Sequence, residues 1–253
     1  MILPFVLSLP HCCADVPPWI RNRLALGRED IKTSVDLGTD EIFGHLPARY
    51  VIKANFTRLV TDLNRSSHDH GEKGVIARTD YHGRPVFLPR QYPEKTDREK
   101  LLQACYYPFH EKLNKAVADP GIKALFDCHS LEGVGPCDAP DAGNKRKDII
   151  LSNNGGKEGQ IEADRGYITC AAETLFTIKQ AFSDQGFSVA VNTPYRGGFI
   201  TRHYGRGLME NNKFALQIEI NQDLFLYPGS KRLNPERIKR VTAKVHKALI
   251  DIC

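Results

Sequence analysis

Short apolar runs bounded by polar residues recur along the whole chain, and this pattern is typical of buried β-strands. The runs that we predict as strands are Ile2–Leu9, Tyr50–Ile52, Arg58–Leu63, Ala124–Cys128, Ile149–Leu151, Phe187–Val191 and Phe214–Ile220. Their spread from one end of the chain to the other indicates one extended sheet rather than a separate β-domain.

Three longer stretches repeat their apolar residues at helical spacing. We predict helices over Arg98–Ala118 and over Asp164–Asp184, with Gly186 as the stop of the second. A last helix is expected after Asn234, which suits the N-cap, with Pro235 in the first turn. Helices that alternate with strands predict an α/β layer fold with a largely parallel sheet.

Composition places the chain among ordinary folded proteins. It has 253 residues, 41% apolar and 26% charged, and we expect residues 1–253 to form a single domain. No run of about 18 apolar residues occurs, and the apolar start is interpreted as a strand rather than a signal peptide. Seven cysteines without a C-x-x-C pair favour a reduced, cytoplasmic protein.

The charge balance bears on the kind of partner. A formal net charge of +5 suits a small anionic substrate and is weak support for nucleic-acid binding. The basic run from Lys231 to Lys247 alternates with apolar residues as a solvated helix face does. We therefore expect neither a nucleic-acid nor a membrane partner, and the oligomeric state stays open.

Residues capable of chemistry follow the predicted strands, where ligands bind in open α/β sheets. His11 follows the first strand, His129 follows the strand that ends at Cys128, and Glu219 lies near the end of Phe214–Ile220. A carboxylate within an apolar strand is costly unless it is paired, protonated or bound to a metal. Two histidines and an acid are the ligands that zinc prefers, so a metal site is one interpretation, while buried structural histidines are the other.

Two further polar segments contain arginines suited to an anionic substrate. Arg58–Arg65 carries an arginine at each end, and Pro194–Gly205 combines Arg196, Arg202 and His203 with glycines that let the backbone approach a ligand. A basic surface turn is the alternative interpretation of the second segment. Two loops rich in Gly, Pro and charge, Ser66–Tyr92 and Leu131–Arg146, are expected to contribute to function.

Seven motifs resemble the N-formylglutamate amidohydrolase family, and they occur in the order expected of that family between about residues 5 and 226. They are Ser8-Leu9-Pro10-His11, Asp36-Leu37-Gly38-Thr39-Asp40, Asp62-Leu63-Asn64-Arg65, Tyr107-Pro108-Phe109-His110, Asp127-Cys128-His129-Ser130, Arg196–Gly205 and Gln217-Ile218-Glu219-Ile220-Asn221. Asp-Leu-Asn-Arg and Asp-x-His also resemble aspartoacylase and the zinc carboxypeptidases. The resemblance implies a three-layer α/β/α sandwich of the phosphorylase/hydrolase-like, zinc exopeptidase type.

The resemblance also implies a metal centre with one Zn²⁺ per chain, although other divalent metals fit the same ligands. His11, His129 and Asp40 are the ligands that it implies. Zinc carboxypeptidases take a glutamate three residues after the first histidine, where this chain has Ala14. The third ligand therefore has alternatives, which are Asp36, Glu41, Asp15 and Glu219.

The remaining roles follow from the same resemblance. Glu219 takes the place of the general base, and Arg58 resembles the arginine that stabilises the oxyanion. Asn64 and Arg65 resemble the pair that binds the substrate α-carboxylate. A second carboxylate would be held by Arg196, Arg202 and His203. The implied reaction is hydrolysis of N-formyl-L-glutamate, or of a similar acidic N-acyl amino acid, by metal-activated water, a reaction that belongs to histidine degradation.

Other classes of protein fit this sequence less well. A serine hydrolase using Ser130 lacks the Gly-x-Ser-x-Gly elbow, and a cysteine hydrolase using Cys12 or Cys13 would need a base that adjacent His11 cannot provide. A non-catalytic carboxylate- or nucleic-acid-binding module is the alternative from outside the enzymes. A metallo-carboxypeptidase-like or aspartoacylase-like hydrolase of another substrate is the alternative within them.

Overall fold

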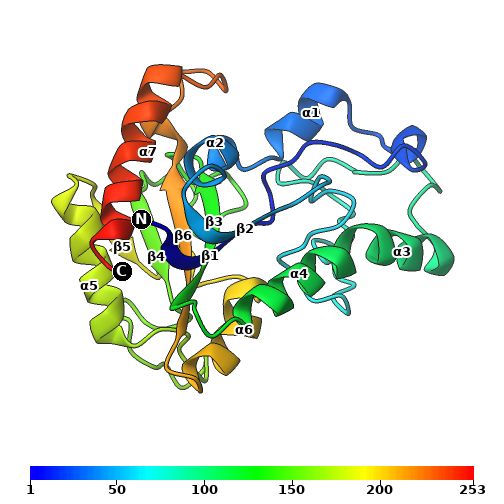
Figure 1. Ribbon diagram of the computed structural model, residues 1–253. Coiled ribbons are helices and arrows are strands. Elements are labelled where there is room, and N and C mark those ends of the chain that lie inside the picture. The colour runs from blue at the N-terminus through cyan, green and yellow to red at the C-terminus, as the bar shows by residue number, and fades with distance from the viewer.

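The computed structural model describes residues 1–253 and shows a mixed six-stranded sheet between two layers of helices (Figure 1). The strands are β1 (Leu3–Leu9), β2 (Ala48–Lys53), β3 (Ala124–Leu131), β4 (Ile149–Ser152), β5 (Val189–Val191) and β6 (Phe214–Asn221). Their order is β2-β1-β3-β6-β4-β5, and all neighbours are parallel except β4 and β6. The prediction of an α/β fold with a largely parallel sheet is confirmed.

Seven α-helices surround the sheet. They are α1 (Arg28–Thr33), α2 (Thr39–Phe43), α3 (Lys95–Leu101), α4 (Tyr107–Val117), α5 (Ala172–Asp184), α6 (Phe199–Met209) and α7 (Pro235–Ile250), with short 3₁₀ turns at Arg21–Arg23 and Gln222–Leu224. Helices α2, α5 and α7 pack in the apolar core on one face of the sheet, and α4 and α6 pack in the core on the other. This is the three-layer arrangement that the resemblance implied. None of the helices is both long enough and apolar enough to cross a bilayer.

The predicted strand Arg58–Leu63 is wrong, because this segment forms a series of turns. Two residues four apart in an extended strand lie about 13 Å from each other. Here the Arg58 guanidinium lies 2.8 Å from the Asp62 carboxylate, so the segment must coil to make this buried ion pair. The other six predicted strands correspond to β1–β6.

The predicted helices are confirmed with shifted bounds. Arg98–Ala118 matches α3 and α4, which are joined by a π-helical turn at Leu102–Tyr106. Asp164–Asp184 begins too early, since α5 starts at Ala172. The preceding residues are held as a loop by side-chain bonds: Asn154 Nδ2 donates to the carbonyl oxygens of Arg165 and Tyr167.

The N-cap of the last helix is as predicted, with the Asn234 side chain accepting from the backbone N–H groups of Glu236 and Arg237 at 3.1 Å. Helices α1 and α2 were not predicted because each is too short to repeat an apolar face. Helix α6 begins within the segment Pro194–Gly205, for which a surface turn was the alternative interpretation and no helix was predicted. Its N-terminus follows Gly198, where a Cβ would lie 2.3 Å from the Asn64 amide.

Candidate active site

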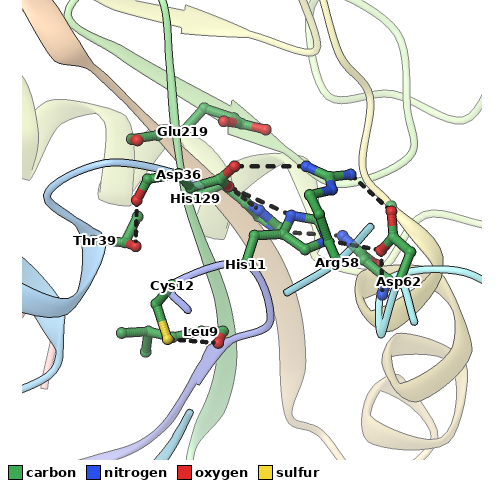
Figure 2. A network of polar contacts seen from close by, with 12 residues as sticks. Leu9, His11, Cys12, Asp36, Thr39, Arg58, Asp62, His129 and Glu219 are labelled. Atoms are coloured by element: carbon green, nitrogen blue, oxygen red, sulfur yellow. Dashed lines mark hydrogen bonds and ion pairs between the residues drawn. The ribbon is translucent and has the colours of Figure 1, made fainter. Parts of the chain in front are cut away.

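Two histidines and an aspartate meet at the carboxyl ends of β1 and β3 (Figure 2). The ring centroids of His11 and His129 are 4.8 Å apart. Asp36 Oδ2 lies 3.5 Å from His11 Nδ1 and 2.8 Å from His129 Nδ1. All three side chains are buried, and one ligand atom from each lies within 4.8 Å of the other two.

Each histidine is oriented by a second buried carboxylate. His11 Nε2 lies 2.7 Å from Asp62 Oδ1, and His129 Nε2 lies 3.2 Å from Asp127 Oδ2. Nε2 of each ring thus lies beside a carboxylate other than Asp36, and Nδ1 of each ring faces Asp36, so Nδ1 is the nitrogen placed to share a metal with Asp36. His11 Nδ1 is buried and has no hydrogen-bond partner. Two imidazole nitrogens and one carboxylate, oriented in this way, fit a divalent metal such as zinc.

Arg58 joins the two carboxylates that contact His11. Its guanidinium lies 2.8 Å from Asp62 Oδ2 and 3.5 Å from Asp36 Oδ1, as Figure 2 shows. Burial alone would raise the pKa of Asp62, but Arg58 and His11 hold that pKa well below its usual range. The same pairing raises the pKa of Arg58 against the opposing effect of burial. Arg58 therefore stays charged, and it positions both carboxylates.

Glu219 lies on β6 directly beside His129 on β3, because the two residues are paired in the register of the parallel strands. The alternation of β6 turns Gln217 and Glu219 toward the α4–α6 face, and Gln217 Nε2 donates to Glu219 Oε1 at 2.9 Å. Glu219 is 8% exposed, and burial raises its pKa to about 7. This carboxyl group can therefore both accept and release a proton near neutral pH.

These groups open into a cavity of about 390 Å³ whose wall is rich in cations. Most of the lining cations are paired with carboxylates, in the pairs Arg58–Asp62, Lys73–Asp138, Arg146–Asp141, Arg196–Glu162 and Lys231–Glu132. Arg65 differs from them, since its guanidinium donates only to the backbone carbonyls of Asn64 and Lys73, both at 3.0 Å. Its remaining donors are available to an anionic ligand.

A family model described as N-formylglutamate amidohydrolase matches residues 3–226. The chain belongs to the N-formylglutamate amidohydrolase family. It is 28% identical to an N-formylglutamate deformylase of Pseudomonas aeruginosa over 243 residues, which cover 88% of this chain and 82% of that one. A second relative, the N-formylglutamate deformylase of Pseudomonas putida, is 26% identical, with 98% and 91% of the two chains covered.

A solved structure of N-formylglutamate amidohydrolase from Ralstonia eutropha JMP134 has the same fold. Its TM-score is 0.76 at 18% identity, and the match covers 98% of this chain and 94% of that one. A gene product of Agrobacterium tumefaciens is also similar, with a TM-score of 0.72 at 17% identity and 98% and 90% coverage. The predictions of this family and of a hydrolase acting on amide bonds are confirmed. This N-formylglutamate amidohydrolase family member is a hydrolase that cleaves amide bonds.

The structure places Asp36, rather than Asp40, beside the two histidines of this amidohydrolase. Asp40, which we expected there, lies on α2 and forms an ion pair with Lys53. Asp36 instead precedes α2, where its backbone N–H donates to the His11 carbonyl at 3.0 Å and brings the carboxylate to both histidines. The alternatives Asp15 and Glu41 are exposed to solvent.

The structure separates the predicted substrate-binding residues of this amidohydrolase into two groups. Arg65 and Arg196 line the cavity, whereas Arg202 is exposed on α6 and His203 stacks on Phe199, both outside it. Arg202 and His203 therefore do not line the cavity, because they lie on helix α6, and their position gives no support to the predicted role in holding a second carboxylate.

Asn64 lines the same cavity, but its amide is already engaged within the protein. Its Nδ2 donates to Asp127 at 3.1 Å, and its Oδ1 accepts from the backbone N–H of Ile200 at 2.7 Å. These bonds connect the carboxylate that orients His129 with the first turn of α6. Asn64 therefore supports the site through bonds within the protein, and the role of Asn64 and Arg65 in binding a substrate α-carboxylate stays a prediction.

Sequence reasoning missed several functional residues of this amidohydrolase. Asp62 and Asp127 belong to motifs that we had recognised, but only the structure shows that they contact the histidines. The alternation of β3 places Asp127 and His129 on one face, which is the signal that could have paired them. Tyr81, Arg146 and Tyr195 also line the cavity, and they lie in segments without a regular pattern. 

Proposed function

We propose that this amidohydrolase cleaves the formyl amide of N-formyl-L-glutamate to formate and L-glutamate. The observation that carries the proposal is the buried cluster of His11, Asp36 and His129, which stands beside Glu219 in a cavity with one unpaired guanidinium. Two relatives that carry the name N-formylglutamate deformylase support the choice of substrate.

One divalent metal ion, zinc in the first place, would be held by Nδ1 of His11, Nδ1 of His129 and the carboxylate of Asp36. The unpartnered His11 Nδ1 is the feature that such an ion explains best. When bound, the metal supplies a Lewis acid that lowers the pKa of water and polarises a carbonyl oxygen. Asp62 and Asp127 lie at Nε2 of the two rings and orient them so that Nδ1 would face the metal.

Glu219 is the proposed general base. Its carboxylate takes a proton from the attacking water and returns it to the nitrogen of the leaving amino acid, so that the carboxylate is restored after each turnover. Arg58 lines the cavity next to Asp36, and its permanent charge favours the negative charge that develops on the amide oxygen. 

Arg65 is the proposed partner of the substrate α-carboxylate. That carboxylate is attached to the same carbon as the scissile nitrogen, so it must bind close to the metal cluster. Arg65 follows Asn64, which contacts His129 Nε2 at 3.1 Å, and Arg65 lines the same cavity as the cluster. Arg196 also lines the cavity and is the proposed partner of the second carboxylate of the substrate.

Formate release from N-formyl-L-glutamate, measured with zinc-loaded protein and with a chelator-treated sample, tests the proposed reaction. Turnover that the chelator abolishes and added zinc restores is the expected result. A folded, zinc-loaded protein that releases no formate would contradict this substrate. Unchanged turnover in a sample shown to be free of metal would contradict the metal centre.

Replacing Arg65 with alanine should raise KM for N-formyl-L-glutamate by about 10- to 100-fold, because a charged hydrogen-bonding partner of the carboxylate is lost. Arg202→Ala is the matched control, since Arg202 is an exposed arginine outside the cavity. Steady-state kinetics of both variants measure the effect. Equal KM values for Arg65→Ala and the wild type would exclude Arg65 from the substrate site.

Replacing Asp62 with asparagine should weaken metal binding by about 10- to 100-fold, because His11 loses the carboxylate that orients its ring. The side-chain volume is conserved, so thermal unfolding of the variant should remain cooperative. Titration with zinc against a chromophoric chelator measures the affinity. A variant that binds zinc as tightly as the wild type would show that His11 needs no such partner.

A further inference from the structure

A tight hairpin in the loop between β2 and α3 carries Tyr81 at its tip. Asp80 is 2% exposed, and its Oδ1 accepts from the backbone N–H groups of His82 and Arg84, each at 2.9 Å. The Arg84 side chain donates to Asp80 Oδ2 at 2.8 Å and also pairs with Asp30 on α1. The hairpin is thereby fixed at its base and tied to a helix, which holds Tyr81 in one place.

Tyr81 lies in the cavity wall between two cations. The Arg58 guanidinium carbon is 4.8 Å from its ring centroid, and Lys73 Nζ is 5.2 Å from it. The phenol hydroxyl makes no hydrogen bond within the chain, whereas the hydroxyl of Tyr195 accepts from Arg146 at 3.3 Å. Burial raises the pKa of Tyr81, so its hydroxyl stays protonated and can act as a donor.

Lys73 connects Tyr81 with Arg65. The Lys73 carbonyl accepts from Arg65 Nε at 3.0 Å, while the Lys73 ammonium group lies over the Tyr81 ring. The same short segment therefore contacts both the unpaired guanidinium and the free phenol. Since Arg58 packs on the Tyr81 ring and also pairs with Asp36, the ring lies in the part of the cavity next to the cluster of His11, Asp36 and His129.

We propose that Tyr81 is a specificity-determining residue whose hydroxyl donates a hydrogen bond to the substrate carboxylate that Arg65 binds. The inference rests on the proposed function, because it assigns one subsite of that same reaction. A carboxylate offers two oxygens, and a guanidinium with a neighbouring hydroxyl satisfies both without adding charge. The hairpin held by Asp80 provides the rigid support that such a subsite requires.

Tyr81→Phe tests the inference, because it removes only the hydroxyl and keeps the ring between Arg58 and Lys73. KM for N-formyl-L-glutamate should rise about 10-fold, with kcat changed by less than about 3-fold, since the lost bond forms in the ground state and the transition state alike. The preference for N-formyl-L-glutamate over its α-carboxamide, measured as a ratio of kcat/KM values, should fall by a similar factor.

Tyr92→Phe is the matched control. Tyr92 lies in the same loop outside the cavity, and its hydroxyl donates to the Ile76 carbonyl at 2.9 Å, so the control loses a structural bond with no change in KM. Calorimetric titration of the metal-loaded protein with L-glutamate adds a readout that needs no turnover. The affinity for L-glutamate should fall about 10-fold in Tyr81→Phe and stay unchanged in Tyr92→Phe.

Two results would overturn the inference. A lower kcat with an unchanged KM and unchanged L-glutamate affinity would place the hydroxyl on the reacting amide instead. Wild-type values for all three quantities would show that Tyr81 does not contact the substrate. Failure of the proposed function is a separate outcome, because the wild-type protein itself would then release no formate from N-formyl-L-glutamate.

Discussion

Glu219→Gln is expected to lower kcat by about 100- to 10,000-fold, the contribution typical of a general acid–base group. The amide of glutamine has the shape of the carboxylate but cannot accept a proton from water. Glu219 is buried on β6 beside His129, and burial raises its pKa to about 7, which suits a group that takes and returns a proton in each turnover. Formate release under saturating substrate measures the loss.

The metal content of Glu219→Gln distinguishes a base from a ligand. The purified variant should hold as much zinc as the wild type, because Glu219 lies outside the cluster of His11, Asp36 and His129. Glu210→Gln is the matched control, because Glu210 is an exposed glutamate at the C-terminal end of α6 and its loss should change neither quantity. A Glu219→Gln protein without zinc would make Glu219 a ligand, and one with full turnover would exclude it as the base.

Asp36→Asn is expected to weaken zinc binding by more than about 100-fold and to abolish formate release at stoichiometric zinc. Loss of a carboxylate that only orients a ligand costs about 10- to 100-fold in affinity, and loss of a ligand should cost more. Asp36 also pairs with Arg58, so the asparagine variant leaves a buried guanidinium with a weaker partner. Competition with a chromophoric chelator measures the affinity.

Asp40→Asn provides the control for Asp36→Asn. The two aspartates are four residues apart, and both belong to the motif in which we expected the third ligand. Asp40 pairs with Lys53 rather than with the histidines, so its variant should bind zinc and release formate as the wild type does. The opposite result, with zinc lost from Asp40→Asn and retained by Asp36→Asn, would restore the ligand that the sequence indicated.

Regular elements were predictable where a local pattern sufficed. The strands β1 and β6 are largely apolar runs, and the last helix has a cap at Asn234 and an apolar face with helical period. Arg58–Leu63 has a similar apolar run, yet it coils because Arg58 and Asp62 form a buried ion pair inside the site. Such an ion pair cannot be recognised from local composition, and the strand prediction is wrong there for this reason.

Residues of the candidate site were likewise predictable only where a local sequence pattern marked them. His11, His129 and Glu219 were found because they stand at the ends of recognisable strands, and the carboxyl ends of parallel strands share one edge of the sheet. Arg202 was placed in the site because it lies in a glycine-rich basic segment. The structure shows α6 there, and Arg202 is exposed on that helix.

The sequence by itself determined the α/β architecture, the family and the two histidines. Apolar periodicity and motif order can be recognised in a sequence without knowing which residues are in contact. Only the tertiary structure decided that Asp36 joins the histidines, that Asp62 and Asp127 orient them, and that Tyr81 reaches the cavity. Apart from the Asp127–His129 pair within β3, those contacts join segments far apart in the chain, through loops without periodicity. Their geometry depends on buried ion pairs and hydrogen bonds that form only when the layers pack together.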